Sequence, residues 1–278
     1  MTGAAPPKPG LRGDYAAART DYTLDQDWGR YTAEEHALWR RLYARQSALV
    51  PRYACAEYLH ALARLDCADG VPRFDRVSRD LRAATGWEIV AVPGLIPDPE
   101  FFAHLAARRF PVTVWLRRRE EIDYIVEPDV FHDFYGHVPL LFEPSYADHV
   151  QAYGAGGLKA LGLDALDMLA RLYWYTIEFG LIRTRDGLRA YGAGLLSSGG
   201  ELAYCVDDPS PRRVAFDLER VLRTEYRIDA YQPTYFVVDS FAALARETAP
   251  DFTPVYERVR RLPALGPTAA DPRDRLAA

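Results

Sequence analysis

Hydrophobic and polar positions follow a helical period along most of this chain. Apolar side chains recur every three or four residues in six segments, the spacing that gives a helix one buried face. We therefore expect helices over residues 33–49, 52–65, 74–84, 98–108, 164–182 and 218–225. Thr32 precedes the first of these and Glu35 follows three residues later, which is the capping-box pattern of a helix start.

The expected strands are few and short. Runs of β-branched and aromatic residues favour strands at residues 88–92, 112–115 and 204–206. The sequence thus predicts a mainly α fold with a few short β-strands. Proline, glycine and alanine dominate the start of the chain. We expect a flexible arm over residues 1–23, one folded domain over residues 24–262 and a disordered tail over residues 263–278.

His132 and His137 stand five residues apart among apolar and aromatic side chains. On a regular α-helix a five-residue step turns about 140°, so the two imidazoles would point apart. Gly136 permits a distortion and Pro139 lacks the N–H that continues a helix, so we expect the helix to distort or end here. The pair differs from the H-E-x-x-H zinc motif, whose histidines are four residues apart. Alone, a pair at this spacing is more often two ordinary hydrogen-bonded histidines, in the interior or at the surface.

Glu178 is a candidate third ligand, inside the helix expected at residues 164–182. Its neighbours one helical turn away are all uncharged: Trp174, Tyr175, Leu181 and Ile182. A carboxylate in such surroundings shifts its pKa or binds a cation, unless it faces solvent. Two imidazoles and one carboxylate form the ligand set of non-haem Fe(II) oxygenases, but zinc-dependent hydrolases use it too. Both classes stay open on these residues alone.

Three motifs in a fixed order carry a more specific signal. They are EPDVFHDFYGHVPLL at residues 127–141, LYWYTIEFGL at 172–181 and YGAGLLSSGGELAYC at 191–205. Together they resemble the tetrahydropterin-dependent aromatic amino acid hydroxylases, and weaker similarity extends from about residue 27 to residue 237. The resemblance implies that residues 24–262 have the catalytic-domain architecture of that family. It also implies a monooxygenase that uses Fe(II), O2 and a tetrahydropterin co-substrate.

The resemblance also assigns roles to individual residues. It implies that His132, His137 and Glu178 hold the iron. It places the pterin at Gly94, Leu95, Ile96 and Phe101, with the ring of Phe101 stacked on it. It implies that Arg117 binds the substrate carboxylate and that Pro128, Trp174 and Phe179 surround the substrate ring. It also implies that Ser197, at the same substrate-binding region, hydrogen-bonds an iron-ligating histidine.

Simpler explanations compete with some of these roles. Arg117 begins a basic run with Arg118 and Arg119, and such runs are usually solvated. Trp174 and Phe179 could be core residues. Asp133 and Glu201 could support the metal ligands or form exposed ion pairs.

The chain departs from the animal members of that family at three positions. Pro97 and Pro99 stand where those members carry serine and arginine beside the pterin loop. Gly199 replaces an aromatic residue, so we expect a more mobile loop around Ser197.

Among aromatic substrates, L-phenylalanine is favoured because short single-domain relatives usually use it. Hydroxylation of tryptophan or tyrosine is the alternative within the family. The regulatory domain and the tetramerising coiled coil of the animal members have no counterpart in the sequence pattern, so we expect a constitutively active monomer.

Composition and charge indicate which kinds of partner the protein has and in which cellular compartment it works. A net charge of −5 without a basic region predicts no nucleic-acid partner, and no apolar run approaches 18 residues, so we expect no membrane insertion. Cys55, Cys67 and Cys205 are odd in number and form no C-x-x-C pair. We expect them to be reduced and buried in a cytoplasmic protein.

Overall fold

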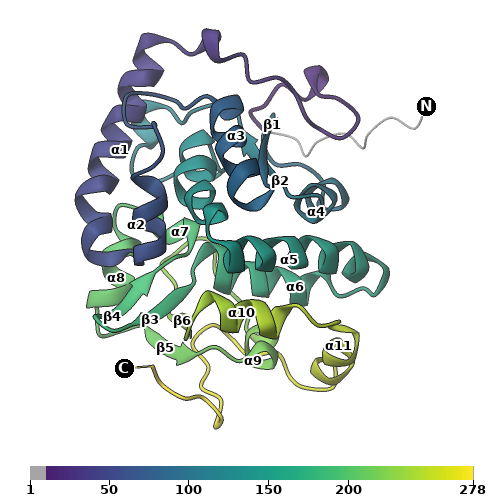
Figure 1. The fold of residues 1–278 in the computed structure, drawn as a ribbon. Coiled ribbons are helices and arrows are strands. Elements are labelled where there is room, and N and C mark those ends of the chain that lie inside the picture. Colours follow the sequence, from purple (N-terminus) through teal and green to yellow (C-terminus); the bar gives the residue numbers. More distant parts are fainter. Residues whose placement is uncertain (1–10, 278) are drawn as a thin grey trace.

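The structure, a computed structural model, describes residues 11–277. Helices dominate it, which confirms the predicted mainly α class (Figure 1). The first half of the described chain contains α1 (Ala33–Tyr53), α2 (Ala56–Leu62), α3 (Phe74–Thr85) and α4 (Asp98–Ala106), with 3₁₀ turns at η1 (Tyr15–Ala17), η2 (Trp28–Arg30) and η3 (Arg119–Glu121).

The start of α1 follows the predicted capping box. The Thr32 side chain accepts a hydrogen bond from the Glu35 amide, and the Glu35 carboxylate accepts one from the Thr32 amide at 2.7 Å. The helix then continues through Pro51 to Tyr53, so the expected break near residue 50 is wrong. Buried residues at helical spacing, such as Trp39 and Leu42, hold this long helix on the domain.

The middle of the chain contains the segments that carry the candidate metal ligands. These segments and their neighbours are η4 (His132–His137), η5 (Val138–Phe142), α5 (Pro144–Gly162), α6 (Leu166–Tyr173) and η6 (Trp174–Glu178). Helices α5 and α6 run side by side across the centre of the molecule (Figure 1). Among the later helices, α10 packs on α5 and α9 packs on α6. These later helices are α7 (Ala193–Leu196), α8 (Glu201–Asp207), α9 (Leu218–Arg223), α10 (Phe241–Thr248) and α11 (Thr253–Val259).

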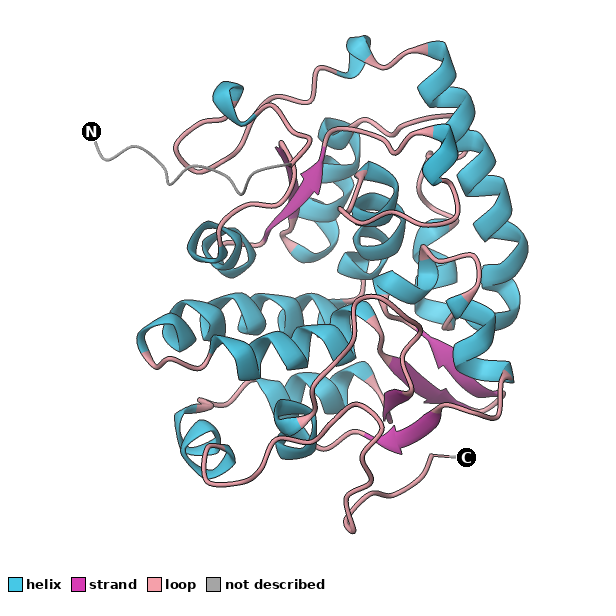
Figure 2. Cartoon of the chain, turned by 180° about the vertical axis from the view of Figure 1, so that it is seen from behind, coloured by secondary structure: helices cyan, strands magenta, loops and turns pink. Residues whose placement is uncertain are grey.

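Two small sheets lie on opposite sides of the helical layer (Figure 2). Strands β1 (Glu88–Val92) and β2 (Arg109–Thr113) pair in parallel through α4, close to the predicted positions. The second sheet has the order β4-β3-β6-β5, in which β3 is antiparallel to β4 and parallel to β6, and β5 is parallel to β6. Its strands are β3 (Leu181–Thr184), β4 (Gly187–Ala190), β5 (Arg212–Ala215) and β6 (Thr234–Val238).

One predicted strand is wrong. Residues 204–206 belong to helix α8, although tyrosine, cysteine and valine are common in strands. Leu202 and Cys205 are both fully buried and lie three residues apart, which is a helical spacing. Tertiary packing of that helical face therefore overrides the local preference for a strand.

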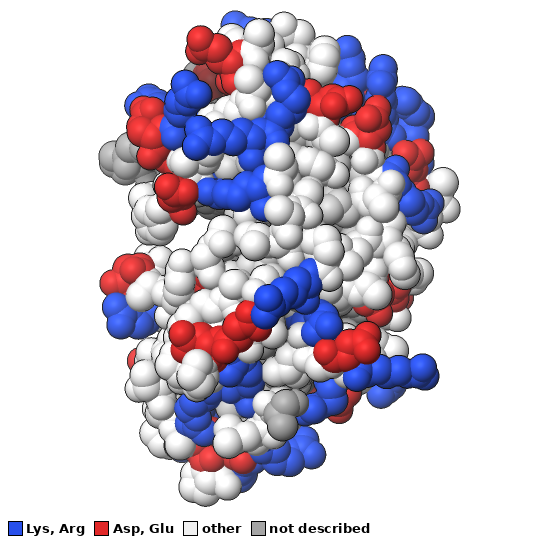
Figure 3. Space-filling model, turned by 90° about the vertical axis from the view of Figure 1, so that its left-hand side faces the viewer, with Lys and Arg blue, Asp and Glu red and all other residues white. Residues whose placement is uncertain are grey.

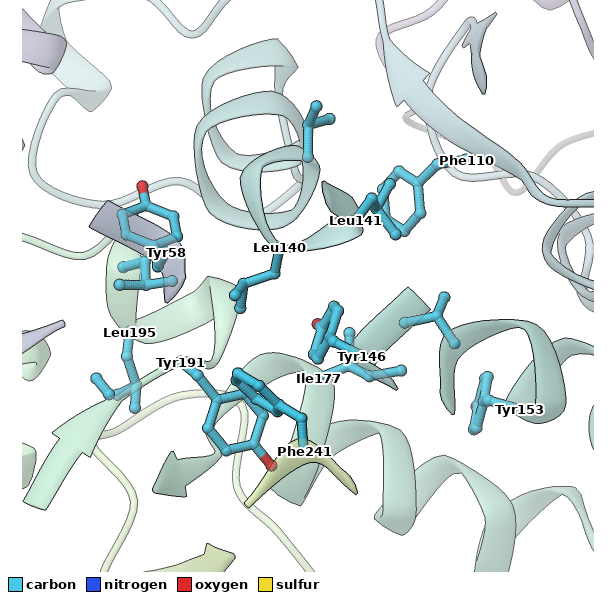
Figure 4. Packing of buried hydrophobic residues seen from close by; sticks show 14 of the residues in the cluster. Tyr58, Phe110, Leu140, Leu141, Tyr146, Tyr153, Ile177, Tyr191, Leu195 and Phe241 are labelled. Atoms are coloured by element: carbon cyan, nitrogen blue, oxygen red, sulfur yellow. The ribbon is translucent and has the colours of Figure 1, made fainter. Parts of the chain in front are cut away.

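The hydrophobic core anchors the segments that carry the candidate ligands. Leu140 and Leu141 lie in η5, three and four residues after His137, and both are fully buried in the core cluster (Figure 4). Ile177 precedes Glu178 and lies close to Tyr146 of α5 (Figure 4). Each ligand-bearing segment is thus fixed by apolar neighbours in its own sequence.

Both ends of the described chain are held against the domain. Leu276 forms a β-bridge with Val214, and Asp274 accepts hydrogen bonds from the buried guanidinium of Arg220 at 2.8 Å. The prediction of a disordered tail is therefore wrong for residues 263–277, because the buried arginine takes its carboxylate partner from the tail. The Tyr15 hydroxyl donates to the Leu95 carbonyl at 2.9 Å, so residues 11–23 also contact the domain, whereas the rest of the expected arm lies outside the described residues.

All three cysteines are free and buried, as the sequence predicted. Among the described residues, no helix combines the length and the apolar character that a membrane crossing needs.

Candidate active site

The segments η4 and η6 are both π-helices, which explains the five-residue spacing of the histidines. In a π-helix the hydrogen bonds join residues i and i+5, so the turn is wider and residues five apart lie on one side. The predicted distortion at Gly136 is thus present, but the helix does not end there. It continues into the 3₁₀ turn η5, where Pro139 occupies one of the first two positions and its missing N–H is tolerated.

His132, His137 and Glu178 converge from these two π-helices. The Glu178 carboxylate lies 3.2 Å from His137 Nε2 through one oxygen and 3.6 Å from His132 Nε2 through the other. The three donor atoms all lie within 4.8 Å of one another, and the two imidazole rings are nearly perpendicular. The geometry therefore gathers the three ligands that the sequence suggested.

Charge favours metal binding at this cluster. Burial alone raises the pKa of the Glu178 carboxyl, but without a metal the attraction to His137 and His132 in their protonated forms outweighs burial and lowers the pKa below its usual value. The carboxylate is therefore ionised, and an anion enclosed by two imidazoles attracts a cation.

Ser197 sets the protonation of His132. The Ser197 hydroxyl donates to the Ala193 carbonyl at 2.8 Å, so its oxygen is left to accept a hydrogen bond from His132 Nδ1, 2.9 Å away. The proton on Nδ1 leaves Nε2 with a free lone pair directed at Glu178. With a second imidazole and a carboxylate on the same side, the residues fit a divalent metal ion such as Fe(II).

Arg117 is buried, whereas Arg118 and Arg119, which follow it in the basic run, are exposed. Its Nε and Nη2 atoms donate to the two oxygens of Asp129, each at 2.9 Å, in a parallel two-bond pair. The same Asp129 carboxylate accepts the His132 amide at 3.0 Å. Asp129 thus joins Arg117 to the metal-binding segment, a role that sequence reasoning missed although Asp129 stands three residues before His132.

The expected ring-pocket residues Pro128, Trp174 and Phe179 are all half-buried. Trp174 begins η6 and Phe179 directly follows it, and the two rings are neighbours, 4.7 Å apart. Half-burial leaves apolar surface of each residue outside the core, so complete core packing does not account for them.

Three of the expected pterin residues, Gly94, Leu95 and Ile96, lie on the loop from β1 to α4, and the fourth, Phe101, lies in α4. Gly94 has φ of 154°, and a Cβ there would come within 2.8 Å of the Tyr15 hydroxyl, so this position requires glycine. Leu95 and Ile96 follow it, with Leu95 exposed. The two prolines that depart from the animal pattern start α4: Pro97 is its N-cap and Pro99 lies in its first turn.

Tyr173 lies near both Phe101 of α4 and the candidate metal ligand His137, and sequence reasoning missed this contact. Its ring lies 5.9 Å from the ring of Phe101 and 6.3 Å from that of His137. The only signal in the sequence was its place five residues before Glu178 within a conspicuously aromatic segment.

Asp133 and Glu201 are buried, which excludes exposed ion pairs for both. Asp133 accepts the Thr113 amide at 2.8 Å and so ties η4 to β2. Gly199 borders the side chain of Arg45 at 3.3 Å from an added Cβ, so a side chain at this position would need Arg45 to move.

Residues 14–260 match the family model described as biopterin-dependent aromatic amino acid hydroxylase. The chain belongs to this family and is therefore a pterin-dependent non-haem iron monooxygenase. The family and the site together do not support the zinc-dependent hydrolase that the ligand set alone left open.

Named relatives agree closely with the chain. A phenylalanine-4-hydroxylase of Ralstonia nicotianae is 58% identical over 254 residues, which are 91% of this chain and 81% of the relative. The Chromobacterium violaceum protein of the same name is 60% identical over 237 residues, 85% of this chain and 80% of the relative. A crystal structure of the C. violaceum phenylalanine hydroxylase bound to cobalt has a TM-score of 0.90 at 57% identity, covering 92% of this chain and 93% of that chain.

Proposed function

We propose that this protein is a phenylalanine 4-monooxygenase that converts L-phenylalanine to L-tyrosine with O2 and a tetrahydropterin. The observation that carries the proposal is the convergence of His132, His137 and Glu178 beside a buried arginine and half-buried aromatic walls. The names of relatives up to 60% identical support phenylalanine as the substrate.

In this proposal, Nε2 of both histidines and the Glu178 carboxylate would hold Fe(II). Bound iron and the tetrahydropterin together supply the activation of O2 that ring hydroxylation requires. Ser197 keeps the His132 proton on Nδ1, and Asp133 holds η4 against β2. The chain itself therefore contributes ligand geometry rather than acid–base chemistry.

The substrate would be oriented at both of its ends. Arg117 keeps Nη1 without a protein partner among residues 11–277, so this edge can bind the amino acid carboxylate while Asp129 fixes the other edge. Pro128, Trp174 and Phe179 would enclose the aromatic ring. Holding both ends positions the ring carbon that reacts and excludes water from it.

The pterin would lie between the loop at Gly94 and the metal. Phe101 would stack on its ring system, while the backbone of Gly94, Leu95 and Ile96 would supply hydrogen bonds. The ring of Tyr173 lies 5.9 Å from that of Phe101 and 6.3 Å from that of His137, which supports a pterin position close to the metal ligands.

A direct assay tests the proposal. Oxygen consumption and amino acid products are measured after Fe(II) reconstitution, with tetrahydropterin and phenylalanine, tyrosine or tryptophan in turn. We expect coupled formation of tyrosine from phenylalanine and a lower kcat/KM for the other two amino acids. Faster coupled turnover of tryptophan or tyrosine would contradict the substrate assignment, and no pterin-dependent turnover at all would contradict the function.

Loss of a ligand gives a second, independent measurement. We expect His137→Ala and Glu178→Ala to bind no stoichiometric iron, because two donors hold a divalent ion far more weakly than three. The exposed His60 supplies a control, since His60→Ala should retain wild-type iron content. Elemental analysis checks this, and full iron occupancy with full activity in either ligand variant would refute the assignment.

We also propose that the enzyme acts as a cytoplasmic monomer without a nucleic-acid partner. Acidic and basic side chains are interspersed on the face in Figure 3, which shows no continuous basic stripe. The last described residues fold onto β5 rather than project as a helix. Light scattering should give the mass of one chain, and a stable tetramer would contradict the monomer.

A further inference from the structure

The indole of Trp174 is held from three sides. Its Nε1–H donates to Gln232 Oε1 at 3.0 Å. One face stacks on Tyr226 at 4.3 Å with an interplanar angle of 14°, and the ring of Phe179 lies 4.7 Å away. These contacts select a single orientation of a side chain that is otherwise half-exposed.

Gln232 can present only its oxygen to Trp174. Its side chain is buried, and Nε2 donates to the carbonyls of Arg227 at 2.8 Å and Ala230 at 3.2 Å. Both amide hydrogens are thereby used. A flipped amide would leave buried donors and acceptors unpaired, so the acceptor for the indole is fixed.

Gln232 is fixed in turn by Glu201, the first residue of α8. One oxygen of the Glu201 carboxylate accepts both the Gln232 amide at 2.8 Å and the Tyr235 hydroxyl at 2.7 Å. Glu201 is buried and forms no ion pair with an arginine or lysine in the part of the chain that the structure describes. Burial raises the pKa of this carboxyl, with the two hydrogen bonds acting in the opposite direction. A buried carboxylate without a cation is costly, and its visible effect is to fix the backbone that carries Gln232.

The segment 197–201 therefore acts on two parts of the site. Ser197 at its start accepts the hydrogen bond of the metal ligand His132, and Glu201 at its end holds Gln232. Gly200 lies against the segment that carries Gln232, since an added Cβ would meet the Tyr231 hydroxyl at 1.9 Å. The metal ligand and the aromatic wall thus share one short support.

We propose that Glu201 and Gln232 are positioning residues that fix the Trp174 indole and thereby set the selectivity of the site for the substrate ring. The proposal rests on the proposed function, because it requires Trp174 to border the ring pocket. Without the acceptor on Gln232, the indole can turn and the pocket admits a larger ring. Discrimination against tryptophan then falls.

The first test needs neither metal nor substrate. The chain contains five tryptophans, so ¹⁵N-tryptophan labelling gives five indole N–H signals at most, and Trp174→Phe identifies the relevant one. We expect Gln232→Met and Glu201→Ala to shift that signal and to speed its exchange with solvent about tenfold, which corresponds to about 1.4 kcal/mol and so to the loss of one hydrogen bond. Glu201→Gln should preserve the signal, since its amide oxygen can accept the same two bonds. An unchanged Trp174 signal in Gln232→Met would overturn the proposal.

The second test measures selectivity. In Gln232→Met and Glu201→Ala we expect the ratio of kcat/KM for phenylalanine to that for tryptophan to fall about tenfold, mainly through KM. Gln151→Met is the matched control, because Gln151 likewise bonds a carbonyl, that of Ala106, and an arginine, Arg108, but lies on α5. This control should lose stability and keep the ratio. An unchanged ratio in Gln232→Met would reduce Gln232 to a structural residue and overturn the selectivity role.

Failure of the proposed function can be distinguished from failure of the positioning role of Glu201 and Gln232. If the wild-type enzyme hydroxylates no aromatic amino acid, the proposed function fails. The indole signal then still decides whether Glu201 and Gln232 position Trp174.

Discussion

The guanidinium of Arg117 has two edges with separate partners. Asp129 occupies the edge formed by Nε and Nη2, and this carboxylate also accepts the amide of the metal ligand His132. A change at Arg117 therefore alters both the Nη1 edge, which is proposed to bind the substrate, and the Asp129 carboxylate that holds η4. Removal of the whole side chain would leave Asp129 buried without its cationic partner, which typically costs about 3–5 kcal/mol, so a conservative variant is more informative.

We predict that Arg117→Lys raises KM for phenylalanine about 10–100-fold, with a smaller effect on kcat. A lysine cannot bond Asp129 and the substrate carboxylate with parallel N–H groups, and a hydrogen bond to a charged group contributes about 1.5–3 kcal/mol. Steady-state kinetics measure this change. Binding of 2-phenylethylamine, which lacks the carboxylate, should be nearly unaffected.

Arg119→Lys is the matched control, since Arg119 belongs to the same basic run but is exposed. Its kinetics should equal those of the wild type. Equal KM values for Arg117→Lys and the wild type would show that Arg117 has no part in substrate binding.

At the same scale, the sequence identified residues whose chemistry is distinctive and missed those whose role is a contact. His132, His137 and Glu178 could be found because histidine and glutamate in apolar surroundings suggest a metal. Asp129, Tyr173 and Gln232 act through hydrogen bonds or ring contacts with distant segments. Such partners are set by the tertiary fold and leave no local pattern.

The two π-helices are the elements that determine the geometry of the site. The sequence predicted a distortion at Gly136, because a regular α-helix cannot bring histidines five residues apart together. It did not predict the second π-helix: the segment to residue 182 had been expected as one helix, but α6 widens at Trp174 and ends before β3. Widening of this kind depends on packing at the ends of the segment, which propensity does not describe.

We predict that Gly136→Ala lowers affinity for a divalent metal about 10–100-fold and lowers Tm. A Cβ at this position would lie 2.8 Å from the Ala193 carbonyl oxygen, which is the acceptor of the Ser197 hydroxyl. The clash would push η4 from α7 and weaken the hydrogen bond to His132, at about 1–3 kcal/mol of stability. Titration with Co(II), followed by its visible absorption, and calorimetry measure the two effects.

Gly156→Ala provides the comparison, because Gly156 lies within α5 and an added Cβ has nothing within 4 Å. Alanine is the better helix former, so we expect equal or greater stability, by up to about 1 kcal/mol, with unchanged metal affinity. If Gly136→Ala binds Co(II) as tightly as Gly156→Ala, close packing of η4 on α7 is not needed for the site.

For the molecule as a whole, His149 connects three elements of the central layer. It is fully buried on α5, with Nδ1 2.7 Å from the Thr248 hydroxyl of α10 and Nε2 3.5 Å from the Thr176 hydroxyl of η6. Burial lowers the pKa of His149 to about 3. The unfolded chain binds this proton near pH 6.5 and the folded chain does not, so stability is complete above pH 6.5 and decreases as pH falls towards 3.

We predict that His149→Asn removes part of this pH dependence. The linkage amounts to about 1.4 kcal/mol per pH unit, or about 2 kcal/mol between pH 6.5 and pH 5. Asparagine can still bond Thr248 but cannot be protonated, so the variant should be less stable at pH 7.5 and show a flatter profile below pH 6.5. Urea unfolding at several pH values measures the difference, and His60→Asn should keep the wild-type slope. Parallel profiles for His149→Asn and the wild type would contradict the prediction.

Fold class was predictable at this scale and topology was not. Helical periodicity in six segments was enough for a mainly α domain, and β1 was placed correctly from its own residues. The sheet β4-β3-β6-β5 joins strands distant in sequence, and the last residues of the chain are fixed by Arg220 and Arg223. Pairings of this kind have no local signature, which is why the tail read as disordered.

The wide turns of η4 and η6 make the chain unusually intolerant of one class of change. Each hydrogen bond of a π-helix spans one residue more than a hydrogen bond of an α-helix. Loss of a single amino acid would therefore leave the segment helical and still buried. That loss would, however, rotate one donor away from the others. In this enzyme the number of residues between the ligands is therefore as decisive as their identity.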